Sequence, residues 1–171
     1  MAVNSVTGKQ TARIIGRHEV EIWRKGKLIH KETVKNGITN GGANYILNAG
    51  FFDATDGVDT WFIGLITNPG TLAAADTLAS HAGWTEWTTV DESPVRQAWV
   101  VVEATGTARA LTNTASVATF TMSAGGTLKG IFVCSVQTGT SGLLWSTANF
   151  TSAITVLDDD VIKVTYSVSI P

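Results

Sequence analysis

Several features are scarce in this chain of 171 residues, and each scarcity argues against a class of protein. The single cysteine, Cys134, excludes an internal disulfide framework and a cysteine-based zinc finger. Charged residues make up only 15% of the chain, which argues against intrinsic disorder. No apolar run approaches the roughly 18 residues that a membrane-spanning helix needs. Residues 1–16 contain no apolar signal-peptide core, so Sec-type secretion is not expected.

The short motifs that carry catalysis or cofactor binding are also missing. There is no P-loop, no dinucleotide-binding glycine motif, no nucleophile elbow and no zinc-protease motif. His18, His30 and His81 are not at metal-ligand spacing, and His18 and His30, which lie in the proposed hairpin, are interpreted as polar strand residues. Cys134 lies in an apolar run and is predicted to be a buried structural thiol. The acidic run 158–160 admits a calcium site, although solvated turn carboxylates are favoured. We therefore expect no metal, no cofactor and no catalytic residues.

What the sequence does contain is a strong β pattern. Apolar and polar residues alternate strictly over 118–123 and 162–169, which indicates strands with one buried face. The apolar runs 61–66, 98–102 and 130–136 are typical of central strands. We predict an all-β, mainly antiparallel fold with a β-sandwich or jelly-roll body.

Local signals add one hairpin and one or two short helices to this body. Runs 18–24 and 27–34 flank Lys25-Gly26, which is a hairpin signal. Thr39 or Asn40 is expected to cap a short helix that ends at Gly50. Asp76 is expected to cap a brief helical turn over 77–81.

Charge is divided unevenly along the chain. Residues 1–35 carry eight basic and three acidic residues, a net +5, whereas residues 36–171 carry a net −7. This predicts a basic N-terminal arm and hairpin (1–35), extended over 1–17, on a β-sandwich body (36–171). An acidic protein surface is the favoured partner of the arm, nucleic acid is disfavoured, and a merely solvated hairpin stays open. The candidate docking residues are Arg13, Arg17, Arg24, Lys25 and Lys27.

Six tryptophans are many for a chain of this length. Trp84 and Trp87 are candidates for an aromatic platform that binds a glycan or a partner protein. The favoured interpretation is that these rings pack in the core, because each ring has a large apolar area to bury.

The order of several segments resembles a small virion protein of tailed bacteriophages, similar to the capsid decoration, or cement, proteins. The similarity spans about residues 36–168 and leaves 1–35 outside. Its most distinctive part is 75–86. The other segments that carry it are 37–48, 61–66, 128–133, 143–147 and 160–166.

The resemblance implies a non-enzymatic protein that is made in the host cytoplasm and binds the exterior of the expanded capsid. Its partner would be the major capsid protein. It would form a homotrimer that ties neighbouring capsomers together, without a cofactor, a nucleic acid or a membrane. One alternative is a tail-fibre, baseplate or head-fibre module that binds host-surface glycans through Trp84 and Trp87. A cell-wall glycosidase using Glu86 or Glu92 ranks below both.

Overall fold

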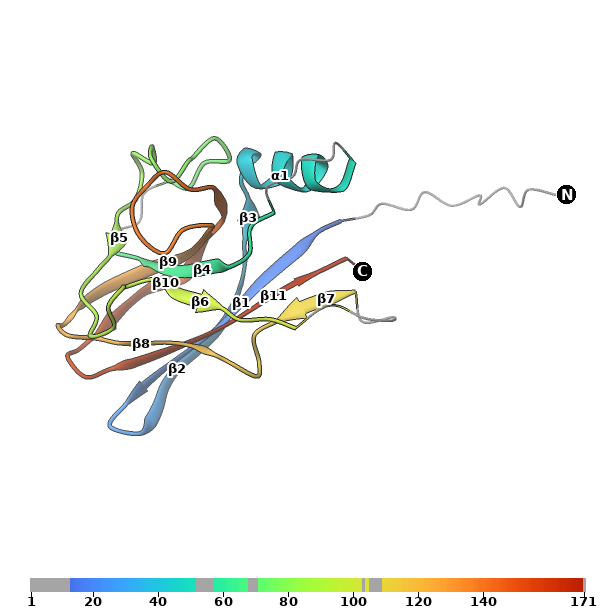
Figure 1. Cartoon of the computed structure of the whole chain (residues 1–171). Coiled ribbons are helices and arrows are strands. Elements are labelled where there is room, and N and C mark those ends of the chain that lie inside the picture. Colours follow the sequence, from blue (N-terminus) through green and yellow to red (C-terminus); the bar gives the residue numbers. More distant parts are fainter. Residues whose placement is uncertain (1–12, 52–56, 68–70, 103, 105–108, 171) are drawn as a thin grey trace, which may run out of the picture.

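A computed structural model describes residues 13–51, 57–67, 71–102, 104 and 109–170 of the chain. These residues form two antiparallel β-sheets that face each other, with one helix beside them (Figure 1). The first sheet holds β1 (Ile15–Arg24), β2 (Lys27–Lys35), β7 (Ala110–Thr112), β8 (Ala118–Thr121) and β11 (Val161–Ser169). The second holds β3 (Gly37–Ile38), β4 (Trp61–Ile66), β5 (Glu86–Trp87), β6 (Gln97–Trp99), β9 (Gly126–Cys134) and β10 (Leu144–Val156). The helix is α1 (Asn40–Phe51). The predicted all-β sandwich is confirmed.

The basic hairpin is an integral part of the first sheet. β1 lies between β2 and β11, and it pairs with β11 from Ile15 opposite Ser169 to Trp23 opposite Val161. At the hairpin turn, Lys25 and Gly26 have φ angles of 49° and 73°, the left-handed pair that tight hairpin turns require. The predicted hairpin is therefore confirmed, but residues 15–35 belong to the sandwich and are not an appendage of it. The rest of the expected arm, residues 1–12, lies outside the described residues.

The second sheet is built around the apolar strand β4. β9 pairs with one edge of β4, and the short strands β5 and β6 pair with the other. The central strand predicted over 61–66 is β4, whereas the one predicted over 130–136 overlaps β9 at residues 130–134, because β9 begins at Gly126 and ends at Cys134. The strand expected over 98–102 is wrong beyond Trp99, because the chain leaves the sheet there and Val100 and Val102 are 52% and 78% exposed.

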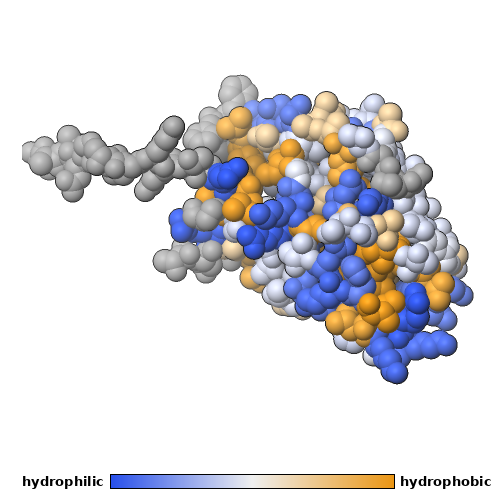
Figure 2. All heavy atoms as spheres, turned by 180° about the vertical axis from the view of Figure 1, so that it is seen from behind, coloured by the Kyte–Doolittle hydropathy of each residue, from blue (hydrophilic) through white to orange (hydrophobic). Residues whose placement is uncertain are grey.

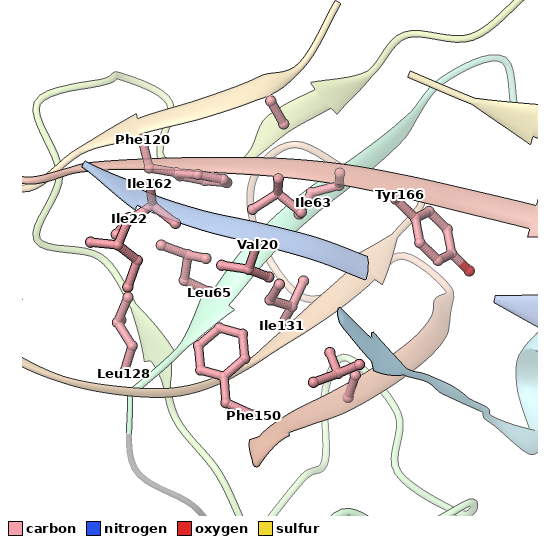
Figure 3. Packing of buried hydrophobic residues seen from close by; sticks show 14 of the residues in the cluster. Val20, Ile22, Ile63, Leu65, Phe120, Leu128, Ile131, Phe150, Ile162 and Tyr166 are labelled. Carbon is pink, nitrogen blue, oxygen red and sulfur yellow. The ribbon is translucent and has the colours of Figure 1, made fainter. Parts of the chain in front are cut away.

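The core lies between the inner faces of the two sheets. Because side chains alternate across a strand, every second residue of β1, β8 and β11 points inward. Figure 3 shows these side chains meeting those of β4, β9 and β10. Each fully buried aliphatic or aromatic side chain contributes roughly 1.5–3 kcal/mol, so this contact dominates the stability of the sandwich. The labelled core residues are Val20, Ile22, Ile63, Leu65, Phe120, Leu128, Ile131, Phe150, Ile162 and Tyr166.

The predicted helix is present and begins where the sequence places its cap. Thr39 Oγ1 accepts a hydrogen bond from the backbone N–H of Gly42 at 3.0 Å, and it donates to the carbonyl of Leu144 in β10. The same threonine therefore caps α1 and fastens it to the second sheet. Gly42 lies against the backbone of Trp145, where a side chain would clash.

Among the described residues, no helix is long and apolar enough to cross a membrane.

The helical turn expected over 77–81 does not form. Asp76 Oδ2 accepts hydrogen bonds from the backbone N–H of Ala73 and from Trp84 Nε1, at 3.0 and 3.1 Å. Its carboxylate therefore accepts hydrogen bonds from the preceding loop and a buried indole, and does not cap the backbone N–H groups of a following helical turn. Thr77 and Ser80 instead close an irregular turn through their backbone groups.

Candidate partner-binding site

The five candidate docking residues do not form one surface. Arg17 lies near the start of β1 and Arg13 lies two residues before the strand, whereas Lys25 is in the hairpin turn at the other end of β1 and Lys27 begins β2. At about 3.3 Å per strand residue, Arg17 and Lys25 are roughly 26 Å apart along β1. In Figure 1 the hairpin turn lies at the lower left, far from the end where β1 begins and β11 finishes. A single partner contact therefore involves one group of cations or the other.

Arg24 is the exception, because a buried carboxylate already holds it. Its guanidinium donates to Asp160 through Nε and Nη2 at 2.8 and 2.7 Å, and Asp160 is only 1% exposed. Asp160 also accepts a hydrogen bond from the backbone N–H of Leu157. The hydrogen bond from Arg24 lowers the pKa of Asp160 and outweighs the effect of burial. The assignment of Arg24 to docking is not supported, and the prediction of solvated turn carboxylates is wrong for Asp160.

Charges along the middle of the hairpin are also matched. Lys31 Nζ donates to Glu19 Oε1 and Glu21 Oε1, at 3.0 and 2.9 Å. These contacts raise the pKa of Lys31 and, with a hydrogen bond from Trp23 Nε1, lower the pKa of Glu21. Although the segment is strongly basic in sequence, the outer surface of its middle part is close to neutral.

Near the start of β1 lie cations that form no ion pair with another described residue. Arg17 lies directly opposite Lys35 of β2, and both line a hollow of about 240 Å³ with Arg13 and Asn36. Among the residues that the structure describes, no carboxylate lines this hollow. We call it the basic hollow. Lys35 was absent from the sequence-based candidates, because only the register of β1 and β2 places it beside Arg17.

The buried base of the basic hollow is polar. Asn36 Nδ2 donates to Tyr166 Oη at 2.9 Å, which fixes the amide above Gly16. Asn36 Oδ1 is buried and has no hydrogen-bond partner in the described part of the chain. Tyr166 Oη also accepts a hydrogen bond from Trp145 Nε1 at 2.7 Å. The hollow is therefore held by side chains from both sheets.

An apolar surface adjoins the basic hollow. Two hollows of about 140 and 400 Å³ share the lining residues Leu111 and Val168, so they are adjacent. Val168 lies opposite Gly16, which lines the basic hollow, so the basic and apolar surfaces are neighbours. Figure 2 shows hydrophobic side chains with hydrophilic ones between them at the left end of the described molecule in that view. The remaining lining residues are Tyr45, Ile46, Trp61, Trp99, Ala104, Arg109, Ala110, Trp145, Ser169 and Ile170.

The proposed Trp84–Trp87 platform is not supported by the positions of the two rings. Trp84 is 5% exposed, stacks on His81 with ring centroids 3.7 Å apart, and donates to Asp76. Trp87 lies partly exposed in β5, where its Nε1 donates to the carbonyl of Thr89. For Trp84 the core interpretation is confirmed. A ring covered in this way has no open face on which a sugar could stack.

The two acids of the glycosidase hypothesis hold structural contacts. Glu86 forms a two-fold hydrogen-bonded pair with the buried Arg96, both at 2.8 Å. Both carboxylate oxygens of Glu92 accept from the backbone N–H of Thr121, in contacts of 2.9 Å. These interactions leave neither carboxylate poised toward an open cleft.

Two further candidate reactive groups, Cys134 and His18, are buried. Cys134 is buried as predicted, and burial raises the pKa of its thiol. His18 is fully buried, and the desolvation lowers its pKa to about 3. In the described part of the chain, no three metal-ligating side chains come together.

Comparison with known proteins adds no further assignment. No protein-family model matches the chain, and a search of curated proteins finds no significant match.

Proposed function

We propose that this protein is a structural component of a tailed-phage virion that binds the outside of the expanded capsid and bridges neighbouring capsomers. The major capsid protein would be its partner, and a homotrimer its working form. The proposal rests on the resemblance of residues 36–168 to capsid decoration proteins. One structural observation supports it best: the basic hollow and an apolar surface adjoin at one end of the sandwich. Surfaces of this mixed kind suit protein partners.

The stabilisation would follow from mass action. A protein that binds only the expanded shell lowers the free energy of that shell by RT ln(1 + [L]/Kd) at each site. In a trimer, three modest contacts act at a high effective concentration, so the whole binds more tightly than any one contact. The rigid sandwich would then transmit load between capsomers without having to change shape.

Co-sedimentation with expanded capsids that lack this protein tests the proposal. The wild-type chain is expected to pellet with capsids and to saturate. Charge reversal at Arg13 and Arg17 is expected to weaken pelleting, whereas reversal at Lys25 and Lys27, the other end of β1, serves as the matched control. Truncation to residue 36 is unsuitable, because it removes β1 from the core of the sandwich. Absence of pelleting by the wild-type chain at both low and moderate salt would overturn the proposal.

The glycan-binding alternative has less support. Its candidate platform requires two accessible indole rings, and Trp84 is almost fully buried. A glycan array on the wild-type protein remains the direct measurement for that alternative.

A further inference from the structure

In the described part of the chain, the pairing of charges on the β1–β2 hairpin leaves cations without a carboxylate partner at two places, the hairpin turn and the start of β1. Lys31 contacts two glutamates, Arg24 contacts Asp160, and His30 Nε2 lies 3.2 Å from Glu32 Oε1. Arg17 and Lys35 face each other across the two strands, as Arg24 and Lys27 do. Arg24 is neutralised by Asp160, whereas no ion pair with a described residue offsets the charges of Arg17 and Lys35. Like charges directly opposite each other destabilise a strand pair. An arrangement that costs stability points to a bound group that offsets the cost.

The basic hollow has the form of a site for a small anionic group. Arg13, Arg17 and Lys35 line one concavity, together with residues 14–16 and Asn36. Its volume is about 240 Å³, and none of the described residues that line it bears a carboxylate. Lys25 and Lys27 provide the contrast, since the concavity beside the hairpin turn, which Lys25 lines, also contains the carboxylate-bearing Asp159.

We propose that the basic hollow binds carboxylate side chains of an acidic segment of the partner protein, with Arg13, Arg17 and Lys35 as its ligands. The inference rests on the proposed function and specifies carboxylates as the chemical group that its docking site recognises. Guanidinium groups bind carboxylates through paired hydrogen bonds, which gives orientation as well as attraction. Lys35, which the sequence did not indicate, becomes a docking residue.

An acidic peptide fits this site better than a nucleic acid does. Residues 36–171 carry a net charge of −7, so a long polyanion laid across the sandwich would be repelled by most of the molecule. Nucleic-acid binding also depends on many phosphate contacts along a track. Three cations around one hollow provide a local contact for one or two carboxylates and no such track.

The test measures binding of fluorescein-labelled hexaglutamate to the purified full-length protein by anisotropy. Hexaglutamine and a single-stranded oligothymidine of similar length serve as comparison probes. The wild-type protein is expected to bind hexaglutamate, and Arg17→Gln/Lys35→Gln is expected to raise the Kd about tenfold, as loss of two partly exposed charge contacts implies. Lys25→Gln/Lys27→Gln is the matched control, with the same change of charge, and is expected to leave the Kd unchanged. Thermal unfolding of both variants shows that each is folded.

Three outcomes would overturn the inference. These are no binding of hexaglutamate by the wild-type protein, an equal loss of affinity in the two double variants, and tighter binding of oligothymidine than of hexaglutamate. The outcome of this peptide-binding test can be distinguished from that of the capsid co-sedimentation test. Peptide binding at the hollow without capsid pelleting refutes capsid decoration and keeps the site. If the Arg17→Gln/Lys35→Gln variant pellets with capsids as well as the wild-type protein does, the basic hollow is not the docking site, but capsid decoration stands.

Discussion

At the scale of single residues, the most unusual side chain is His18. It is fully buried at the centre of the first sheet and stacks on Tyr166 with ring centroids 4.2 Å apart. Neither ring nitrogen has a hydrogen-bond partner in the described part of the chain. Burial lowers the pKa of His18 to about 3, so the folded protein holds the imidazole neutral at ordinary pH. A buried polar group without partners costs stability, which makes His18 a weak point of the core.

Stability is predicted to fall with acidity below about pH 6.5, because the unfolded chain protonates His18 and the folded chain does not. The folded-state pKa lies near 3, so the loss continues at about 1.4 kcal/mol per pH unit until that value is approached. His18→Phe keeps an aromatic ring against Tyr166 and removes the titration. Urea unfolding of both proteins from about pH 7 to about pH 5 measures the difference.

Comparison of the two proteins at each pH isolates His18 from the carboxylates. Asp160 and Glu21 have lowered pKa values, so they also lose stabilising interactions in acid, but in both proteins alike. His18→Phe is expected to be the more stable variant, increasingly so as the pH falls. Parallel stability curves for the two proteins would contradict the prediction.

At the scale of elements, strict alternation was the most reliable signal in the sequence. The alternation over 118–123 and 162–169 corresponds to β8, which ends earlier at Thr121, and to β11, because one face of each strand covers the core. The apolar run 98–102 was less reliable. β6 pairs with only three residues of β4 and ends at Trp99, since a run of apolar residues does not reveal how long a neighbouring strand remains beside it.

The lining of the basic hollow was predicted only in part, because charge composition does not reveal charge pairing. The sequence identified Arg13 and Arg17, but Arg24 is held by Asp160, 136 residues further along the chain. Lys35 enters the site through strand register alone. Burial of Trp84 likewise depends on the loop around Asp76 folding back over the second sheet. Such contacts between distant segments arise only with the tertiary fold.

Asp160 and Asp158 offer a matched test within one turn. Asp160→Asn is predicted to lower the free energy of unfolding by about 2–3 kcal/mol, because charge-assisted hydrogen bonds to Arg24 and Leu157 are lost in a buried position. Asp158 is exposed, so Asp158→Asn is predicted to change the free energy of unfolding by less than about 0.5 kcal/mol. Chemical denaturation of both variants at neutral pH gives the comparison. Equal effects would mean that the contact of Asp160 with Arg24 adds little.

At the scale of the whole molecule, folding redistributes a charge that the sequence divides at residue 35. The middle of the basic segment is neutralised by Glu19, Glu21 and Asp160, so the unmatched cations are left at the ends of β1. The end that holds the basic hollow also holds the apolar surface. Charge there would steer the protein toward an acidic partner, and apolar contact would retain it once bound.

This division of roles predicts how salt acts on capsid binding. Screening shortens the range of charge attraction, so the association rate constant of the wild-type protein is expected to fall about tenfold between low and high ionic strength. The dissociation rate constant is expected to change much less, because apolar contacts are not screened. In Arg13→Gln/Arg17→Gln the association rate constant is expected to be low at every salt concentration and nearly independent of it. Surface plasmon resonance over immobilised expanded capsids measures both constants. If the variant shows the same salt dependence as the wild-type protein, the steering charges lie elsewhere and the basic end of β1 does not guide docking.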